Sequence, residues 1–551
     1  MPGGADGFDC DVLIVGAGPT GLTLARELRA LGVSVQLVDR APDAVHESRA
    51  LAIQARTLEV LARNGLADDL VAAGNPSGTL LLHGGRRRRG PGAVNPGRAV
   101  PLFDEALRDT RYPFLLFLSQ AHTERILVER LASIGVGVGR GLTLTGLDQD
   151  ADGVTCTLGS AGIPPRTVRA RYVVGCDGAH SDTRRLAGIA FRGRAFPQRF
   201  LLADLEVDGI EVDGIEPGRV HVYLAAAGPL FLFPLGSPAS WRLLVMLPPN
   251  LPSGRITLEV LQSTVDRYTG DQLRLHDPVW LTEFTISSRL AAAFQRGRVL
   301  LAGDAAHIHS PAGAQGMNTG IQDAVNLAWK LALVCRGTAA PALLGSYTAE
   351  RMPVARSVLA MTDRAFRVAT SPGALARRLR AGLAARAAAA VLRSRLARTV
   401  GFRLISQLSI HYRRSPLSVE GRPRLRHGPR AGERFPQPGL GPARAGTVGT
   451  AGTAGTAGRP VFRMVLIGPA ARWPAAPVRQ FAREWAHLVT VERRDFAPRS
   501  RWSAAPRPRP GARRYRGTAQ YLLRWDGYVG YRAEGTDLAG ATAYLHSLAG
   551  S

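Results

Sequence analysis

The hydrophobic pattern of residues 12–38 predicts a strand, a helix and a second strand. Residues 12–15 are all apolar, as in a buried strand. Residues 33–38 predict a second strand, and between the two segments leucines recur at helical spacing, at Leu24, Leu28 and Leu31. This order of elements predicts that the chain opens with a Rossmann-like α/β unit.

A glycine-rich turn stands between the first predicted strand and the helix. Its residues are Gly16, Ala17, Gly18, Pro19, Thr20 and Gly21. Glycines here permit a tight turn, close approach of the backbone to a pyrophosphate, and close packing of the helix on the strand. Asp39 ends the second strand, about twenty residues on, where a carboxylate can bind a ribose hydroxyl. We interpret the pattern as a dinucleotide-binding fingerprint rather than a purely structural turn.

A second strand-and-turn pattern lies further along the chain. Residues 299–301 predict a buried strand, Gly303 lets the backbone turn, and Asp304 offers a carboxylate to ribitol or ribose hydroxyls. Pro311 and the glycine-rich residues 313–320 follow, and they open a helix whose apolar face carries Ile321, Val325, Ala328 and Ala332. Unpaired N–H groups at that helix start can accept the negative charge of a reduced flavin ring. The pattern is typical of a flavin-binding crossover.

A third turn and a β-rich region lie between these two patterns. The apolar strand near residues 170–175 breaks at Asp177-Gly178, and the polar, basic stretch after it favours a role in positioning a flavin or nicotinamide coenzyme over an ordinary turn. Residues 219–233 and 240–247 predict a sheet that roofs a pocket. Candidate lining residues are His221, Tyr223, Phe233 and Trp241, with core packing as the alternative. No residue can be named as a catalytic base.

The amino-acid composition of the C-terminal third changes twice along the chain. Residues 372–398 carry Ala, Leu and Arg at helical spacing and predict long connecting helices. Residues 421–458 are poor in apolar residues and rich in Pro, Gly and Arg, so we expect a linker or long loop that buries little surface. Beyond it, apolar runs at 461–467, 489–491 and 521–524 around a helical pattern at 478–487 predict a small α/β domain.

The amino-acid composition argues against nucleic-acid binding, membrane insertion and a metal site. The net charge of +27 and the run of arginines at 86–89 suggest nucleic-acid binding, but Lys330 is the only lysine and the arginines are spread along all 551 residues without interleaved aromatics. We therefore expect no nucleic-acid partner. No apolar run reaches about 18 residues, so no membrane span is expected and the cytoplasm is the expected location. The four cysteines lack a metal-ligand or dithiol spacing, so no metal site is expected.

With these motifs in place, the chain resembles the single-component (class A) FAD-dependent aromatic hydroxylases related to para-hydroxybenzoate hydroxylase. The glycine turn at 16–21, Asp177-Gly178 and the Gly303-Asp304 loop match together and in order over roughly residues 8–415. Within the family the chain is most similar to polyketide hydroxylases and rifampicin-type monooxygenases. The resemblance implies an FAD-binding domain at 8–182 and 285–415, a substrate-binding sheet domain at 75–110 and 183–284, and a thioredoxin-like domain at 425–551.

The resemblance also implies roles for individual residues. It assigns Asp39 to the adenosine ribose, Arg40 to the adenine, and Arg49 and Gln120 to the FAD pyrophosphate region. It assigns Asp304 to the ribitol or pyrophosphate, while Gly316, Met317 and Asn318 are expected to line the N1/O2 edge of the flavin. For Arg49 a plain surface arginine is the alternative.

The activity that the resemblance implies is hydroxylation of an aromatic polyketide or polycyclic phenol. NADPH binds transiently and reduces the FAD, and the reduced flavin reacts with O2 to a C4a-hydroperoxide, which the phenol ring attacks. A Baeyer–Villiger oxygenase acting on a polycyclic ketone is the first alternative, and an antibiotic-inactivating monooxygenase is the second. A flavin-dependent halogenase is disfavoured, since the chain lacks a WxWxIP segment. A non-catalytic FAD-binding protein is disfavoured because three motifs are intact. A homodimer is a candidate assembly.

Overall fold

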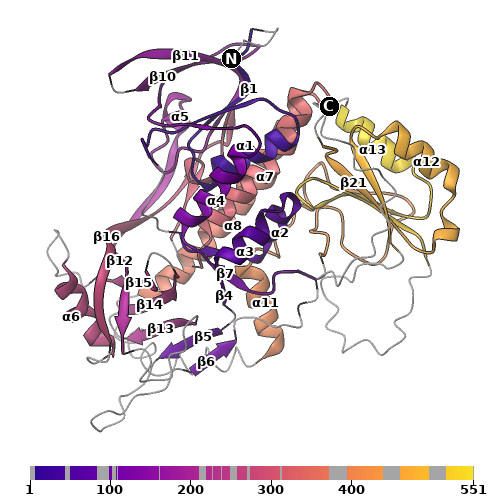
Figure 1. Ribbon diagram of the computed structural model, residues 1–551. Coiled ribbons are helices and arrows are strands. Elements are labelled where there is room, and N and C mark those ends of the chain that lie inside the picture. The colour runs from indigo at the N-terminus through magenta and orange to yellow at the C-terminus, as the bar shows by residue number, and fades with distance from the viewer. Residues whose placement is uncertain are drawn as a thin grey trace.

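The structure is a computed structural model. It describes residues 7–43, 50–77, 79–83, 98–101, 107, 109–160, 162–209, 219–225, 228–236, 239–247, 257–269, 273–310, 313–370, 394–437, 459–494 and 517–549. All structural statements concern these residues. The protein is a mixed α/β structure with two large sheets, a small three-stranded sheet and a C-terminal five-stranded sheet (Figure 1).

The first large sheet has a parallel centre. Strand β1 (Cys10–Val15) lies between β2 (Val35–Val38) and β11 (Ile163–Gly175), and β18 (Val299–Leu301) pairs in parallel with β11. The remaining strands are β8 (Val138–Gly139), β9 (Thr143–Gln149), β10 (Val154–Ser160) and β17 (Gln295–Arg296). The predicted Rossmann-like opening is therefore present as a strand–helix–strand unit, with α1 (Pro19–Ala30) between β1 and β2.

Helices pack on this sheet and on each other. Helix α1 packs against α7 (Gly316–Cys335), and Figure 1 shows the two helices at the centre of the molecule. Further helices are α2 (Ala55–Leu61), α3 (Leu66–Ala73), α4 (Gln120–Ala132), α5 (Asp182–Leu186), α8 (Gly345–Thr370) and α11 (Arg395–Ile405), and η3 (Gly303–Ala305) is a short 3-10 turn. Long helices are expected at 372–398, but residues 371–393 lie outside the described part. The described end of that range, from residue 395, belongs to α11. No helix among the described residues is long and apolar enough to cross a bilayer.

The predicted apolar face of α7 is confirmed, but the rest of that helix is buried as well. Ile321, Val325, Ala328 and Ala332 are almost fully buried, and so are the polar Asp323, Asn326 and Lys330 on the same helix. The polar side of α7 is therefore covered by other parts of the chain rather than by solvent.

The second large sheet has two different faces. Its strands are β5 (Thr79–His83), β6 (Arg98–Pro101), β12 (Phe191–Asp208), β13 (Val220–Ala225), β14 (Gly228–Pro234), β15 (Trp241–Met246), β16 (Arg274–Ala291) and β19 (His307–Ile308). One face packs against α6 (Leu258–Thr269), with Leu243 and Leu261 in the same buried cluster. The other face packs against the small sheet, which consists of β3 (Ala52–Ile53), β4 (Asn75–Ser77) and β7 (Leu115–Phe117). There Val222 clusters with Phe117 of β7 and with Leu51, which directly precedes β3.

The C-terminal sheet confirms the predicted strands and helix. It contains β20 (Val419–Glu420), β21 (Phe462–Ile467), β22 (Val489–Arg494), β23 (Ala519–Leu523) and β24 (Val529–Glu534), with helices α12 (Ala475–Glu484) and α13 (Ala539–Ala549). Strands β23 and β24 form an antiparallel hairpin. We call its connecting residues 524–528 the C-terminal hairpin loop.

The expectation that residues 421–458 bury little surface is wrong for the described part, 421–437. Leu425 and Phe435 are buried in a cluster with Val465 and Tyr521 of the C-terminal sheet. Apolar residues are few in this segment, but they are spaced so that each one reaches the sheet. Residues 438–458, which include the Gly-Thr-Ala repeat, lie outside the described part.

Candidate functional site

The three sequence motifs meet at one edge of the first sheet. Val15 pairs with Gly175, and Gly175 pairs with Leu301, so the parallel strands β1, β11 and β18 end side by side. The glycine turn, the Asp177-Gly178 turn and the Gly303-Asp304 turn each begin within two residues of these strand ends. Ligands of doubly wound sheets bind at the carboxyl ends of the strands, so this edge is the candidate cofactor site.

The glycine turn forms a cradle that side chains would fill. Gly16 has a φ of +104°, and a Cβ there would lie 2.3 Å from the Cys176 carbonyl oxygen. A Cβ on Gly21 would lie 1.9 Å from the Gly16 carbonyl oxygen. At Gly18 no described atom lies within 4 Å of the Cβ position, so the backbone is open to a ligand. Helix α1 begins next to it without a side-chain cap, which leaves N–H groups for a pyrophosphate.

Thr20 is the point where the glycine turn at 16–21 contacts Gly303 and the glycine-rich start of α7. A Cβ on Gly303, which has a φ of +61°, would lie 2.6 Å from Thr20 Oγ1, and a Cβ on Gly320 would lie 2.4 Å from the same atom. Thr20 therefore packs into the space that Gly303 and Gly320 leave. Pro19 occupies the first turn of α1, where its missing N–H costs nothing.

Asp39 is held beside the glycine turn. Its Oδ2 accepts the Ala17 N–H at 2.6 Å, and its Oδ1 accepts the Ala41 N–H at 2.8 Å. These contacts fix the carboxylate at the end of β2, which is where the fingerprint requires a ribose acceptor. Arg40 follows it and is exposed. Arg49 and Pro311 lie outside the described residues, so their assignments stay predictions.

Gln120 begins helix α4 and lies against a buried carboxyl group. Its backbone N–H donates to the Ala50 carbonyl at 3.2 Å, and its Nε2 donates to Glu124 Oε1 at 2.7 Å. Burial raises the pKa of Glu124 to about 7, and its Oε2 has no hydrogen-bond partner among the described residues. The sequence analysis did not single out Glu124, although its i, i+4 spacing from Gln120 was visible.

The Asp177 carboxylate is engaged within its own turn. It accepts the Ser181 hydroxyl at 2.5 Å and both the N–H and the hydroxyl of Thr183 at 2.9 Å. Arg184, in the helix that follows, donates to the Ala305 carbonyl at 2.8 Å. The Asp177 turn is thereby tied to the Gly303-Asp304 turn. Asp304 itself is exposed, rather than buried as expected for a cofactor hydroxyl acceptor.

The start of α7 is held by Asn318. Its Nδ2 donates to the Ala52 and Ala314 carbonyls at 2.8 Å, and its Oδ1 accepts the Gln54 N–H at 2.8 Å. Its side chain therefore positions the loop. Ala314 has a φ of +51°, a conformation that costs a non-glycine residue roughly 1–2 kcal/mol.

The N-terminus of α7 can accept a negative charge. The helix begins at Gly316 and Met317 without a side-chain cap, so its first N–H groups have no partner within the helix and can bind an anionic group. The glycine cradle and the two uncapped helix starts fit FAD, which carries a pyrophosphate and, when reduced, a negative ring.

His309 is a polar residue that the sequence analysis missed. Its Nδ1 lies 2.8 Å from the Ser310 carbonyl oxygen, which can only accept, so Nδ1 carries the proton and Nε2 the lone pair. Nε2 is buried and has no partner among the described residues, and it lies 3.8 Å from the Cβ position of Gly316. Burial lowers the pKa of His309 to about 4, so the imidazole is neutral. The only signal in the sequence is its place in the loop.

The four candidate lining residues do not share a face of the second sheet. Tyr223 and Trp241 belong to the cluster packed against α6, and His221 lies with them, 5.6 Å from Trp241 between ring centroids. His83 joins this group, with its Nε2 3.1 Å from His221 Nδ1. Phe233 lies on the opposite face, 5.8 Å from Phe117.

A charged pair lies on the same face as Phe233. Arg242 pairs with Phe233 across β14 and β15, and it forms two hydrogen bonds of 2.6 Å to Asp204. Its third contact is the Ala50 carbonyl at 3.2 Å, which links the sheet to the segment before β3. Both side chains are buried. This pair was not predicted, because nothing in the sequence places residues 204 and 242 together.

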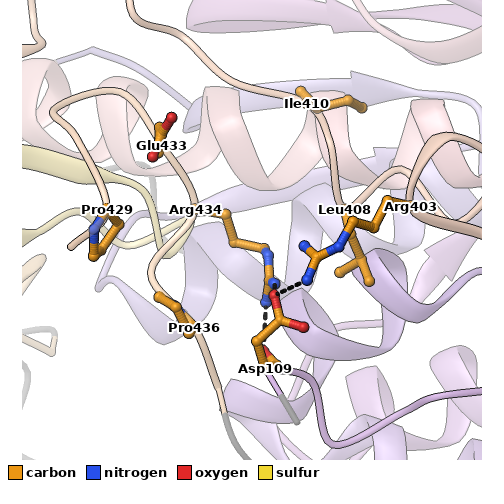
Figure 2. A pocket seen from close by; sticks show the side chains of 8 residues that line it. All are labelled: Asp109, Arg403, Leu408, Ile410, Pro429, Glu433, Arg434 and Pro436. Atoms are coloured by element: carbon orange, nitrogen blue, oxygen red, sulfur yellow. Dashed lines mark hydrogen bonds and ion pairs between the residues drawn. The ribbon is translucent and has the colours of Figure 1, made fainter. Parts of the chain in front are cut away.

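A small hollow lies away from these motifs. It is lined by Asp109, Arg403, Leu408, Ile410, Pro429, Glu433, Arg434 and Pro436 (Figure 2). Arg434 and Arg403 both bind the Asp109 carboxylate, at 2.6 and 2.9 Å, and Arg434 also binds Glu59 at 2.7 Å, so each guanidinium faces a carboxylate. None of the predicted site residues lines it.

Comparisons with known proteins agree with this geometry. Residues 9–362 match the FAD binding domain family. The chain is 38% identical over 424 residues to 6-methylpretetramide 4-monooxygenase of Streptomyces rimosus, covering 76% of this chain and 72% of that protein. It is 38% identical over 379 residues to rifampicin monooxygenase of Streptomyces venezuelae, covering 68% and 75%. The solved OxyS anhydrotetracycline hydroxylase from Streptomyces rimosus superposes with a TM-score of 0.72 at 32% identity, covering 98% of this chain and 99% of that one.

Proposed function

Because the chain belongs to the FAD-binding family of class A aromatic hydroxylases, we propose that it hydroxylates an aromatic polyketide or a related polycyclic phenol, with NADPH as reductant and O2 as oxidant. The observation that carries the proposal is the meeting of three motifs at one sheet edge, opposite an apolar face of the second sheet. The similarity to monooxygenases named for pretetramide, rifampicin and anhydrotetracycline supports a polycyclic substrate.

Bound FAD would supply the electrons taken from NADPH and the activated oxygen at its C4a carbon. The residues proposed to hold it are the glycine turn at 16–21, Asp39, Gln120, Asp304 and the start of α7. The N–H groups at that start stabilise negative charge on the ring edge. The buried walls exclude water from the reaction.

The second sheet supplies the proposed substrate wall. Phe231 and Phe233 are stacked with centroids 5.7 Å apart and an interplanar angle of 4°, which suits a flat aromatic substrate. The proposal keeps Phe233 as a lining residue and leaves out His221, Tyr223 and Trp241, because these three pack toward α6. The lone pair on His309 Nε2 is the proposed acceptor for a phenol proton, since it is unpartnered beside Gly316.

We also propose three domains: an FAD-binding domain at 8–182 and 285–415, a substrate-binding sheet domain at 75–110 and 183–284, and a thioredoxin-like domain at 425–551. Sheet membership supports it: β5, β6 and β12–β16 form one sheet, which the short β19 of the FAD-binding part extends at its edge, and β20–β24 form another. Strand β20 begins at Val419, so the C-terminal part starts slightly before residue 425.

The similarity to rifampicin monooxygenase favours a second candidate, inactivation of an antibiotic by the same chemistry. One experiment separates the candidates. NADPH oxidation by the purified, flavin-containing protein is measured with and without polycyclic phenols, polycyclic ketones and rifampicin. The products are identified by mass spectrometry. We expect stimulation by a phenol and a product one oxygen heavier, oxidised at a ring carbon. A lactone from a ketone points to Baeyer–Villiger oxidation, a rifampicin product to inactivation, and absence of bound flavin overturns the proposal.

A further inference from the structure

We propose that Tyr412 is a positioning residue through which the C-terminal hairpin loop holds the Gly303-Asp304 turn in its FAD-binding conformation. The inference rests on the proposed function, because it assumes that this turn contacts FAD. It gives the C-terminal part of the chain a role in cofactor binding.

A chain of hydrogen bonds, which we call the relay, runs from the Gly303-Asp304 turn through Asp323 and Arg351 to Tyr412. It begins at the turn. The Gly303 N–H donates to Asp323 Oδ2 at 3.1 Å, and His307 Nε2 lies 2.7 Å from the same oxygen. Asp323 is fully buried on α7. Burial disfavours its ionised form, but Arg351 and His307 outweigh burial and hold the pKa of Asp323 below its ordinary value. The carboxylate is therefore charged and fixes the Gly303 backbone.

Arg351 carries the relay across to the segment after α11. Its Nε donates to Asp323 Oδ1 at 2.6 Å, and its Nη2 donates to the Thr319 carbonyl in the first turns of α7 at 3.1 Å. Its Nη1 donates to the Tyr412 hydroxyl at 2.8 Å. All of these side chains are buried, so no solvent is available to replace a lost contact. The orientation of Arg351 therefore depends on Tyr412.

Tyr412 in turn is held by the C-terminal hairpin loop. Its ring lies 4.3 Å from the Tyr528 ring between centroids, and the Arg524 guanidinium lies 5.2 Å from the Tyr412 centroid. Arg524 is fully buried and forms hydrogen bonds of 2.6 and 2.9 Å to Glu350 on α8, the same helix as Arg351. The hairpin loop thus fixes both Tyr412 and the helix that presents Arg351.

Asn326 and Lys330 of α7 are also linked to this cluster. Asn326 Nδ2 donates to Asp526 Oδ2 of the hairpin loop at 3.0 Å, and Lys330 Nζ donates at 2.8 Å to Oε2 of Glu350 on α8, the residue that Arg524 also binds. Burial lowers the pKa of Lys330 to about 8 although Glu350 opposes this shift. In Figure 1 the C-terminal sheet lies beside α2 and α7, as these contacts require. The polar side of α7 is buried by this loop.

The test compares two tyrosines in the full-length protein. Tyr412→Phe removes the hydroxyl that accepts from Arg351 and keeps the ring. Tyr528→Phe is the matched control, because the Tyr528 hydroxyl is buried without a partner among the described residues. FAD binding to the apoprotein is measured by flavin fluorescence, and the flavin midpoint potential is measured on the reloaded protein. We expect Tyr412→Phe to weaken FAD binding about tenfold and to shift the potential, and Tyr528→Phe to change neither.

Two further variants separate positioning from general stability. Tyr528→Leu removes the ring that holds Tyr412, and its effect on FAD affinity should not add to that of Tyr412→Phe, since both act on one relay. Val265→Ala opens a cavity in the buried cluster between α6 and the second sheet, a cluster that includes none of the residues of the relay. It should lower the unfolding temperature and leave FAD affinity unchanged.

The outcomes are distinct. Wild-type apoprotein that takes up no FAD overturns the proposed function, and this inference with it. If the wild type binds FAD and folded Tyr412→Phe binds it equally well with the same potential, the inference alone is overturned. Equal weakening by Tyr528→Phe, or additive effects of Tyr412→Phe and Tyr528→Leu, also overturns it.

Discussion

Arg242 and Asp204 form a two-point ion pair buried in an otherwise apolar sheet face. The Nε–Oδ1 and Nη2–Oδ2 distances are both 2.6 Å, and the Phe233 side chain is the neighbour of Arg242 on the adjacent strand. A buried ion pair rarely stabilises a protein more than packed apolar side chains would, because the desolvation penalty of the two charges offsets much of their mutual attraction. Its third contact, to Ala50, indicates that it aligns the sheet with the segment that precedes β3.

Arg242→Leu is expected to destabilise the protein by about 3–5 kcal/mol, because Asp204 is left buried without its partner. The free energy of unfolding in denaturant measures this. The double variant Arg242→Leu/Asp204→Leu should recover most of the loss. If the single variant loses less than about 1 kcal/mol, Asp204 finds another partner or becomes neutral at little cost.

Glu124→Gln is expected to flatten the pH dependence of stability. Burial raises the pKa of Glu124 from 4.5 to about 7 in the folded state. The folded state therefore binds the proton more tightly, and this stabilisation is complete below the unfolded pKa of 4.5 and lost as pH rises through about 7. Glutamine keeps an acceptor for Gln120 and cannot ionise. Unfolding free energies of the wild type and the variant should converge at low pH and separate, with the variant more stable, as pH rises to 8; parallel curves contradict the assignment.

Asp304→Ala is expected to weaken FAD retention strongly, because Asp304 follows β18 at the shared strand edge where cofactor hydroxyls are proposed to bind. Flavin content after purification measures it. Asp182→Ala is a suitable control, since Asp182 lies in α5 and pairs with Arg185. Asp304→Ala protein with a full flavin complement contradicts the assignment.

His309→Gln is expected to slow product formation about 100-fold at saturating phenol while FAD stays bound. Glutamine lacks the fixed ring lone pair that Nε2 presents beside Gly316. His487→Gln, at an exposed position in the C-terminal part, should leave the rate unchanged. The measurement is the rate of oxygenated product formation at saturating phenol. An unchanged rate with His309→Gln removes it as the proton acceptor.

The cofactor edge was predictable because its signals are local. A strand, a turn that needs glycine, and a helix start are neighbours in sequence, and parallel strands bring their carboxyl ends to one edge whatever the rest of the chain does. The positions of Gly16, Asp39 and Gly303 at that edge follow from this rule. The apolar face of α7 followed from helical periodicity for the same reason.

The sheet faces were not predictable to the same degree. Alternation placed His221 and Tyr223 together on one face, and the structure has them there. It did not reveal which face packs against α6 and which against the small sheet, because that depends on how these elements pack in the folded chain. Phe233 and Arg242 lie together on the face opposite α6 because they pair across β14 and β15.

The dinucleotide fold, the three turns and the family of the chain follow from the sequence, since each depends on residues close together or on motifs in fixed order. The burial of the polar side of α7 is visible only in the folded chain. Asp323, Asn326 and Lys330 read as a solvent-facing side, yet Arg351, Glu350 and the hairpin loop, all distant in sequence, cover them. Long-range pairing of charges obeys no sequence period, so it becomes visible only when the chain is folded.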